Sequence, residues 1–222
     1  MKAAITLILA ASTLISAAAD RIPKEMRPKL VKEGKVLVQD DFSTEKLHEG
    51  WLMPKGDFAG KVTRQPDGTV QIETGVGRQG YIYRKLDPGT QDASVQLLIK
   101  PQTSTWMGVR FTVAGEDGVG DRHWKIATIA YASGFIRVVE PDAAADVNKL
   151  KVLKSAKTDI KPGEWWRISV ESREDKYLVR VNGEEMIELK HPGTAGEKVA
   201  VMVNLYGGTG LIDEVKVMAG GK

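Results

Sequence analysis

The chain has 222 residues, with 32 lysines and arginines against 29 aspartates and glutamates, so its formal net charge is +3. It contains no cysteine, which excludes disulfides, thiol nucleophiles, cysteine zinc sites and iron–sulfur clusters. The charges are spread along the chain without a block of one sign, and this disfavours nucleic acid as a partner.

The first nineteen residues have the pattern of a signal peptide. Lys2 supplies a positive charge, residues 3–16 form an uncharged, mostly apolar run, and three alanines at 17–19 provide the small side chains that signal peptidase requires. The run is shorter than the about 20 residues that a membrane-spanning helix needs, and no later segment is long enough to span a bilayer. We expect cleavage before Asp20 and export to the periplasm or the exterior, where a bacterial protein without cysteine is common.

Residues 20–34 form a charged segment with Pro23 and Pro28, which predicts an extended leader or linker. From residue 35 onwards, apolar and polar residues alternate, and turn sequences separate the alternating runs. The pattern predicts strands at 36–39, 62–64, 69–73, 81–86, 94–100, 107–113, 123–131, 135–139, 166–171, 177–181, 186–189, 199–205 and 212–217. Residues 35–219 are therefore expected to form one all-β domain, a two-sheet antiparallel β-sandwich or jelly roll.

The clearest hairpin signal is Asn182-Gly183, which lies between two alternating runs. Asn-Gly favours the type I′ turn, because its twist matches that of paired strands. Tyr177, Val179 and Val181 would then share one face of the preceding strand.

Three segments carry a resemblance to a known superfamily. Gly163-Glu164-Trp165-Trp166, followed by alternating strands and Asn182-Gly183, is similar to the penultimate region of concanavalin A-like and laminin-G-like sandwiches. The opening Asp40-Asp41-Phe42 with Gly50-Trp51 and the closing strand at 210–217 resemble the same domains. Among bacterial proteins, the chain resembles secreted sandwiches related to 3-keto-disaccharide hydrolases. The resemblance spans 36–217 and implies a fold, but this superfamily includes lectins, binding modules, glycosidases and lyases.

The catalytic strand of the superfamily's glucanases, Glu-x-Asp-x-x-Glu, is missing. Its nearest approach, Glu140-Pro141-Asp142, lacks the third carboxylate, and its proline would interrupt a central strand. No Gly-x-Ser-x-Gly occurs, and His48, His123 and His191 lie in unrelated contexts without metal-binding spacing. Glucanase chemistry is disfavoured, while other enzyme classes stay open.

Alternation also predicts an aromatic and polar surface on the face opposite the core. If Met107 and Val109 point inwards, Trp106 and Arg110 point outwards, and other strands behave in the same way. Aromatic rings can stack on sugar rings, while arginine and asparagine donate to hydroxyl groups. The alternative is that these tryptophans pack in the core or at its rim. The candidate ligand-binding residues are Trp106, Arg110, His123, Arg137, Asn204 and Tyr206.

A structural calcium ion is a further candidate. If the first and last strands pair, Asp40 or Asp41 approaches Asp213, and carboxylate oxygens are the ligands that calcium prefers. The alternative is that these acids end strands and face water.

Three functions stay open from the sequence. The first is a non-catalytic domain that binds a glycan or cell-surface polysaccharide, or that serves as a surface interaction domain. The others are a glycoside-processing enzyme similar to 3-keto-disaccharide hydrolases and a structural module of an exported complex. The missing acid pair and the aromatic surface favour the first. The oligomeric state is not determined by the sequence.

Overall fold

The computed structural model describes residues 22–32, 34–44, 47, 50–53, 60–114, 125–141 and 150–221. The predicted signal peptide, His48 and His123 lie outside these residues. The described chain forms thirteen strands and one short 3-10 helix at Pro192–Thr194. In these ranges there is no helix with the length and apolar character needed to cross a membrane.

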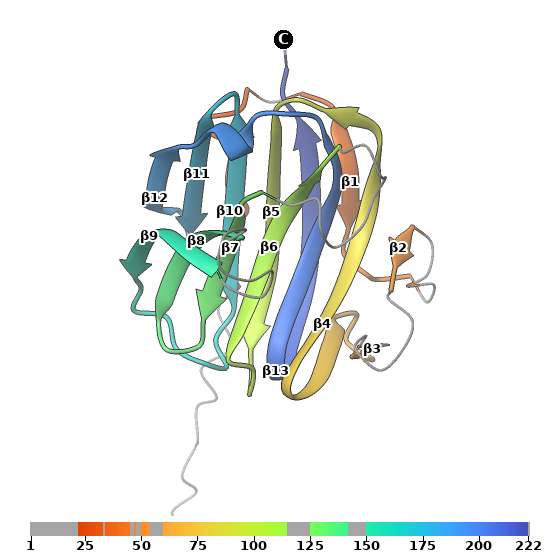
Figure 1. Cartoon of the computed structure of the whole chain (residues 1–222). Helices are drawn as coiled ribbons and strands as arrows, with labels where there is room; N and C mark the ends of the chain where they lie inside the picture. Colours follow the sequence, from red (N-terminus) through yellow and green to blue (C-terminus); the bar gives the residue numbers. More distant parts are fainter. Residues whose placement is uncertain are drawn as a thin grey trace, which may run out of the picture.

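Two antiparallel sheets pack against each other, and two long strands take part in both. These are β4 (Val70–Thr90) and β13 (Lys198–Ala219), which fold over at the lower end of Figure 1. Residues 79–90 of β4 pair with 198–206 of β13 in one sheet, and 70–74 pair with 208–212 in the other.

The remaining strands extend the two sheets sideways. Sheet I contains β2 (Trp51–Leu52), the second half of β4, the first half of β13, β6 (Trp106–Val113), β7 (Ala127–Tyr131), β8 (Phe135–Pro141) and β9 (Leu150–Lys157). Sheet II contains β3 (Lys61–Arg64), the first half of β4, β1 (Val36–Asp40), the second half of β13, β5 (Ala93–Pro101), β10 (Trp166–Arg173), β11 (Lys176–Val181) and β12 (Glu184–Lys190).

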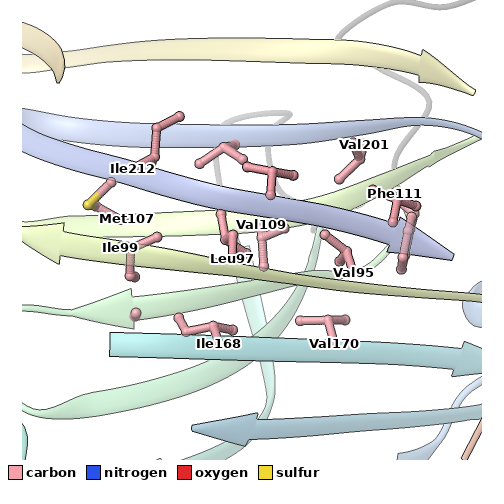
Figure 2. Close-up of a cluster of buried hydrophobic side chains, with 14 of the residues drawn as sticks. Val95, Leu97, Ile99, Met107, Val109, Phe111, Ile168, Val170, Val201 and Ile212 are labelled. Atoms are coloured by element: carbon pink, nitrogen blue, oxygen red, sulfur yellow. The ribbon is translucent and has the colours of Figure 1, made fainter. Parts of the chain in front are cut away.

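The core lies between the sheets and is built by strict alternation along the strands. Met107, Val109 and Phe111 of β6 lie in one buried cluster with side chains of β5 and β10, such as Leu97 and Ile168 (Figure 2). Burial of each such side chain stabilises the fold by about 1.5–3 kcal/mol relative to an exposed one.

One polar contact connects the sheets within this core. The Tyr177 hydroxyl of β11 lies 3.0 Å from the Thr128 hydroxyl of β7, and both residues are fully buried. Burial raises the pKa of Tyr177 well above its ordinary value, so the phenol is neutral and can share this hydrogen bond.

The predicted all-β sandwich is confirmed, and so is the predicted hairpin. Asn182 and Gly183 have φ angles of 52° and 95°, as a type I′ turn requires, and they join β11 to β12. Tyr177, Val179 and Val181 all face the core.

Two features of the strands differ from the prediction. β9 was not predicted, because its residues are mostly exposed and a β-bulge opposite Val138 and Val139 breaks its alternation. β4 and β13 are each continuous where two strands were predicted on either side of a glycine-rich segment. The segments at 74–80 and 206–210 stay in the sheet because they pair with each other, as at Gly208 and Thr74.

Candidate functional site

Three adjacent cross-strand rows form the outer surface of sheet I, which we call the aromatic face. The pairing register gives their members from β4 or β13 to β8: Tyr206, Trp106, Tyr131 and Phe135; then Tyr81, Asn204, Gly108, Ile129 and Arg137; then Tyr83, Met202, Arg110, Ala127 and Val139. Five of the six predicted ligand-binding residues therefore lie on one surface, and the sixth, His123, lies outside the described residues.

The aromatic face is built around a stacked pair of rings. Trp106 and Tyr206 are nearly parallel, with ring centroids 5.6 Å apart and an interplanar angle of 6°. Trp106 is only 8% exposed, whereas Tyr206 is half-buried. Trp106 thus supports Tyr206 from one side, and Tyr206 is the ring of the pair that a ligand can reach.

Two arginines lie on the aromatic face in different environments. The Arg137 guanidinium lies 4.8 Å from the centre of the Tyr131 ring, and both side chains are half-buried. Such a cation–π contact holds the guanidinium flat on the ring. Arg110 is 7% exposed, and its Nη2 lies 2.8 Å from the Met202 sulfur. Arg137 is therefore the more accessible of the two.

Gly108 makes space for the Asn204 side chain. A Cβ atom at position 108 would lie 2.6 Å from the Asn204 Oδ1 atom and 3.2 Å from the Thr128 carbonyl oxygen. A glycine within a strand often marks such a close approach, so this signal was available in the sequence. It was not used to identify the site.

Three tyrosines of the aromatic face were missed by the sequence-based prediction. Tyr81 and Tyr83 alternate with buried Ile82, and their rings lie 6.4 Å apart. Alternation alone predicts that they point outwards, but only the pairing of β4 with β13 places them beside Asn204. Tyr131 is likewise assigned to the surface by its pairing with Trp106.

Asp40 and Asp41, two of the predicted calcium ligands, make local hydrogen bonds. Asp40 accepts from the Trp51 indole at 2.8 Å and from the Phe42 backbone N–H at 2.9 Å. Asp41 accepts from the Ser43 backbone N–H at 3.0 Å, and hydrogen bonds from Ser43 hold the pKa of Asp41 below its ordinary value.

Asp213, the third predicted ligand, lies near Asp41 because β1 pairs with β13. Burial raises the pKa of Asp213, and the Glu214, Asp41 and Asp67 carboxylates raise it further. Among the residues that the structure describes, no three His, Asp or Glu side chains are grouped closely enough to hold a metal ion. Calcium binding by Asp40, Asp41 and Asp213 stays a prediction.

The outer surface of sheet II has a different character, because residues 22–32 lie across it. We call this segment the strap and the surface beneath it the strap face. The Glu171 carboxylate is fully buried and accepts three backbone N–H groups of the strap, from Lys29 at 2.8 Å, Leu30 at 2.6 Å and Val31 at 3.0 Å. Arg180 donates to Glu171 at 2.8 Å.

Other side chains of sheet II also bind the strap through its backbone. The Gln96 amide accepts from the Met26 N–H at 2.9 Å and donates to the Met26 carbonyl at 3.1 Å. Arg167 donates to the Pro23 carbonyl at 2.7 Å and forms an ion pair with Glu214. A polar pocket of about 230 Å³ lies beside these residues, and the charged groups within it are largely paired with one another.

Comparisons with known proteins bear on the fold. No family model and no curated protein matches the chain. Among solved structures, the carbohydrate binding module CBM66 from Bacillus subtilis aligns over 77% of this chain and 96% of its own, with 12% identity and a TM-score of 0.54. A galectin-like protein of unknown function from Bacillus subtilis aligns over 85% and 98%, with 10% identity and a TM-score of 0.61.

The carbohydrate recognition domain of Emp46p, in its metal-free form, aligns over 86% of this chain and 99% of its own, with 8% identity and a TM-score of 0.59. At such low identity these likenesses concern the backbone arrangement alone. The chain has the antiparallel β-sandwich fold of galectin-like and lectin-like domains.

Proposed function

We propose that the chain is an exported, non-catalytic carbohydrate-binding domain that uses the aromatic face of sheet I. The observation that carries this proposal is the reachable Tyr206 ring, stacked on Trp106, beside Asn204. Tyrosine rings offer flat apolar surfaces to the C–H faces of a sugar, and amide and guanidinium groups donate to its hydroxyls. Ligand sites commonly combine such apolar surfaces with a few convergent polar groups.

The solved structures with this fold support the same reading. Two of those compared are named for carbohydrate binding, CBM66 and the Emp46p recognition domain. Because one fold hosts many functions, this support is an analogy, and the residues of the aromatic face carry the proposal.

The non-catalytic part of the proposal follows from the residue types on this surface. Most glycoside hydrolases use two carboxyl groups, about 5 Å apart in retaining enzymes and farther apart in inverting ones. The three described rows of the aromatic face contain no aspartate or glutamate. The similarity to 3-keto-disaccharide hydrolases therefore extends to the sandwich, while the acid pair that hydrolysis commonly uses is missing from these rows.

The proposal is tested with the processed chain, residues 20–222, on a glycan array, followed by titration calorimetry. We expect Tyr206→Ala to weaken binding roughly tenfold, because one stacked ring contributes about 1 kcal/mol beyond its buried area. Trp165→Ala is the matched control, since Trp165 is a half-buried aromatic residue outside the aromatic face that contacts Lys100. This control should bind like the parent.

Two outcomes would overturn the proposal. One is a parent protein that binds no glycan on the array, with or without calcium. The other is binding that survives both Tyr206→Ala and Tyr131→Ala unchanged. Turnover of a keto-disaccharide would contradict the non-catalytic assignment alone.

A further inference from the structure

The paired positions of the aromatic face carry cations but no carboxylate. Extending its three rows to the neighbouring strands adds Gln79 from β4 and Lys157, Ser155 and Val152 from β9. Among these described positions, Arg110, Arg137 and Lys157 are basic and none is acidic. The adjacent row adds Lys85, which pairs with Ala200 and is exposed.

The strap face shows how the same chain treats cations elsewhere. There, Arg180 pairs with Glu171 at 2.8 Å, Arg167 pairs with Glu214, and Lys216 pairs with Glu25. On the aromatic face, Arg137 instead lies on the Tyr131 ring. A ring contact orients a guanidinium but leaves its full positive charge, so its N–H groups still favour an anionic acceptor.

From this difference, we propose that the ligand of the aromatic face is an acidic glycan that bears carboxylate or sulfate groups. The inference rests on the proposed function. Lys85 on β4 and Lys157 on β9 flank the rows, and Arg137 lies between them on β8. Cations arranged in this way raise the positive potential over the surface between them, which concentrates an anionic chain there. The tyrosine rings then contact the sugar, while the cations contact its charged groups.

The first experiment compares probes by titration calorimetry on the processed chain. Polygalacturonate supplies carboxylates, chondroitin sulfate supplies sulfates as well, and dextran of similar length is the neutral probe. We expect at least one acidic probe to bind roughly tenfold or more tightly than dextran. At about 1 M salt, where the Debye length is about 3 Å, this advantage should shrink.

The second experiment places the charge on the aromatic face. We expect the double variant Lys85→Gln/Lys157→Gln and the single variant Arg137→Gln to weaken binding of the acidic probe by roughly three- to fivefold per charge removed. The matched control is Lys176→Gln/Lys190→Gln, which removes two charges from β11 and β12 of sheet II. This control should bind within about twofold of the parent.

The outcomes separate this inference from the proposed function. Tight binding of neutral glycans without preference for acidic ones would overturn the inference and leave the proposed function standing. Failure to bind any glycan would overturn both. Equal weakening in the sheet II control would show that net charge, rather than the aromatic face, attracts the probe, and this would also overturn the inference. Preference between the two acidic probes identifies the anionic group.

Discussion

The aromatic face and the strap face are the outer surfaces of two sheets built by the same alternation, yet they treat polar groups differently. On the strap face, Gln96, Glu171 and Arg180 are buried and bonded to backbone groups of residues 22–32. On the aromatic face, Arg137 and Tyr131 contact each other and stay half-exposed. The hydrogen-bonding capacity of the strap face is used within the chain, whereas that of the aromatic face is still available to a ligand.

The strongest way to break this comparison is to remove the carboxylate that binds the strap. We expect Glu171→Ala to lower the free energy of unfolding by about 3–5 kcal/mol, because it leaves Arg180 buried without its partner and three N–H groups without an acceptor. Denaturant unfolding measures this loss, and proteolysis should cut first within residues 22–32. Glycan binding below the unfolding transition should not change.

Glu184→Ala is the control for this experiment, since Glu184 is exposed beside the β11–β12 turn. It should cost less than about 0.5 kcal/mol. A loss below about 1 kcal/mol in Glu171→Ala would contradict the role of Glu171 in holding the strap.

Lys198 extends the comparison to a buried cation of sheet I that binds backbone carbonyls. It is 1% exposed, and its Nζ donates to the carbonyls of Gln91 and Thr194. Burial lowers the pKa of Lys198 from 10.5 to about 8, against a smaller opposing effect of Asp92. Between these values the unfolded chain binds more protons than the folded chain, so stability should rise with pH by up to about 3 kcal/mol.

Denaturant unfolding from pH 7 to 10.5 measures this slope. In Lys198→Met the rise should be missing, while Lys190→Met, which changes an exposed lysine, should keep it. Identical pH profiles for the parent and Lys198→Met would contradict the lowered pKa.

The contact between Tyr177 and Thr128 tests whether the two sheets depend on each other. We expect Tyr177→Phe to cost about 1–2 kcal/mol, because the Thr128 hydroxyl is left buried without its partner. Replacing both groups, in Tyr177→Phe/Thr128→Val, should recover part of the loss. Thermal unfolding of the two single variants and the double variant completes the cycle, and strictly additive losses would argue against the hydrogen bond.

The smallest stability effect, with the clearest effect on binding, is expected at Gly108. Gly108→Ala places a methyl group 2.6 Å from the Asn204 amide oxygen, so the amide must move. We expect about 1 kcal/mol of destabilisation and roughly tenfold weaker glycan binding. Asn204→Ala should remove most of the stability cost of Gly108→Ala, and a cost that persists would point to the Thr128 carbonyl instead.

Much of the candidate site follows from local sequence. A strand alternates its side chains whatever it pairs with, so buried Met107 and Val109 already placed Trp106 and Arg110 on the opposite face. The same local rule predicted the Asn182-Gly183 turn, because a type I′ turn depends only on its own φ angles.

Strand order, by contrast, depends on pairing between distant segments, and alternation carries no information about it. Only the tertiary structure placed β4 beside β13, so that Tyr81 and Tyr83 join Asn204 on one surface. It also showed that Tyr206 covers Trp106, which a pattern of outward-facing residues could not reveal.

The N-terminal segment shows the same division most clearly. The prolines and charges of residues 20–34 predicted an extended leader or linker, since they offer no alternation and no helical period. Whether such a segment packs against the domain depends on acceptors and donors elsewhere in the chain. Glu171 lies about 140 residues away from the backbone it binds, and only the folded sandwich brings the two together.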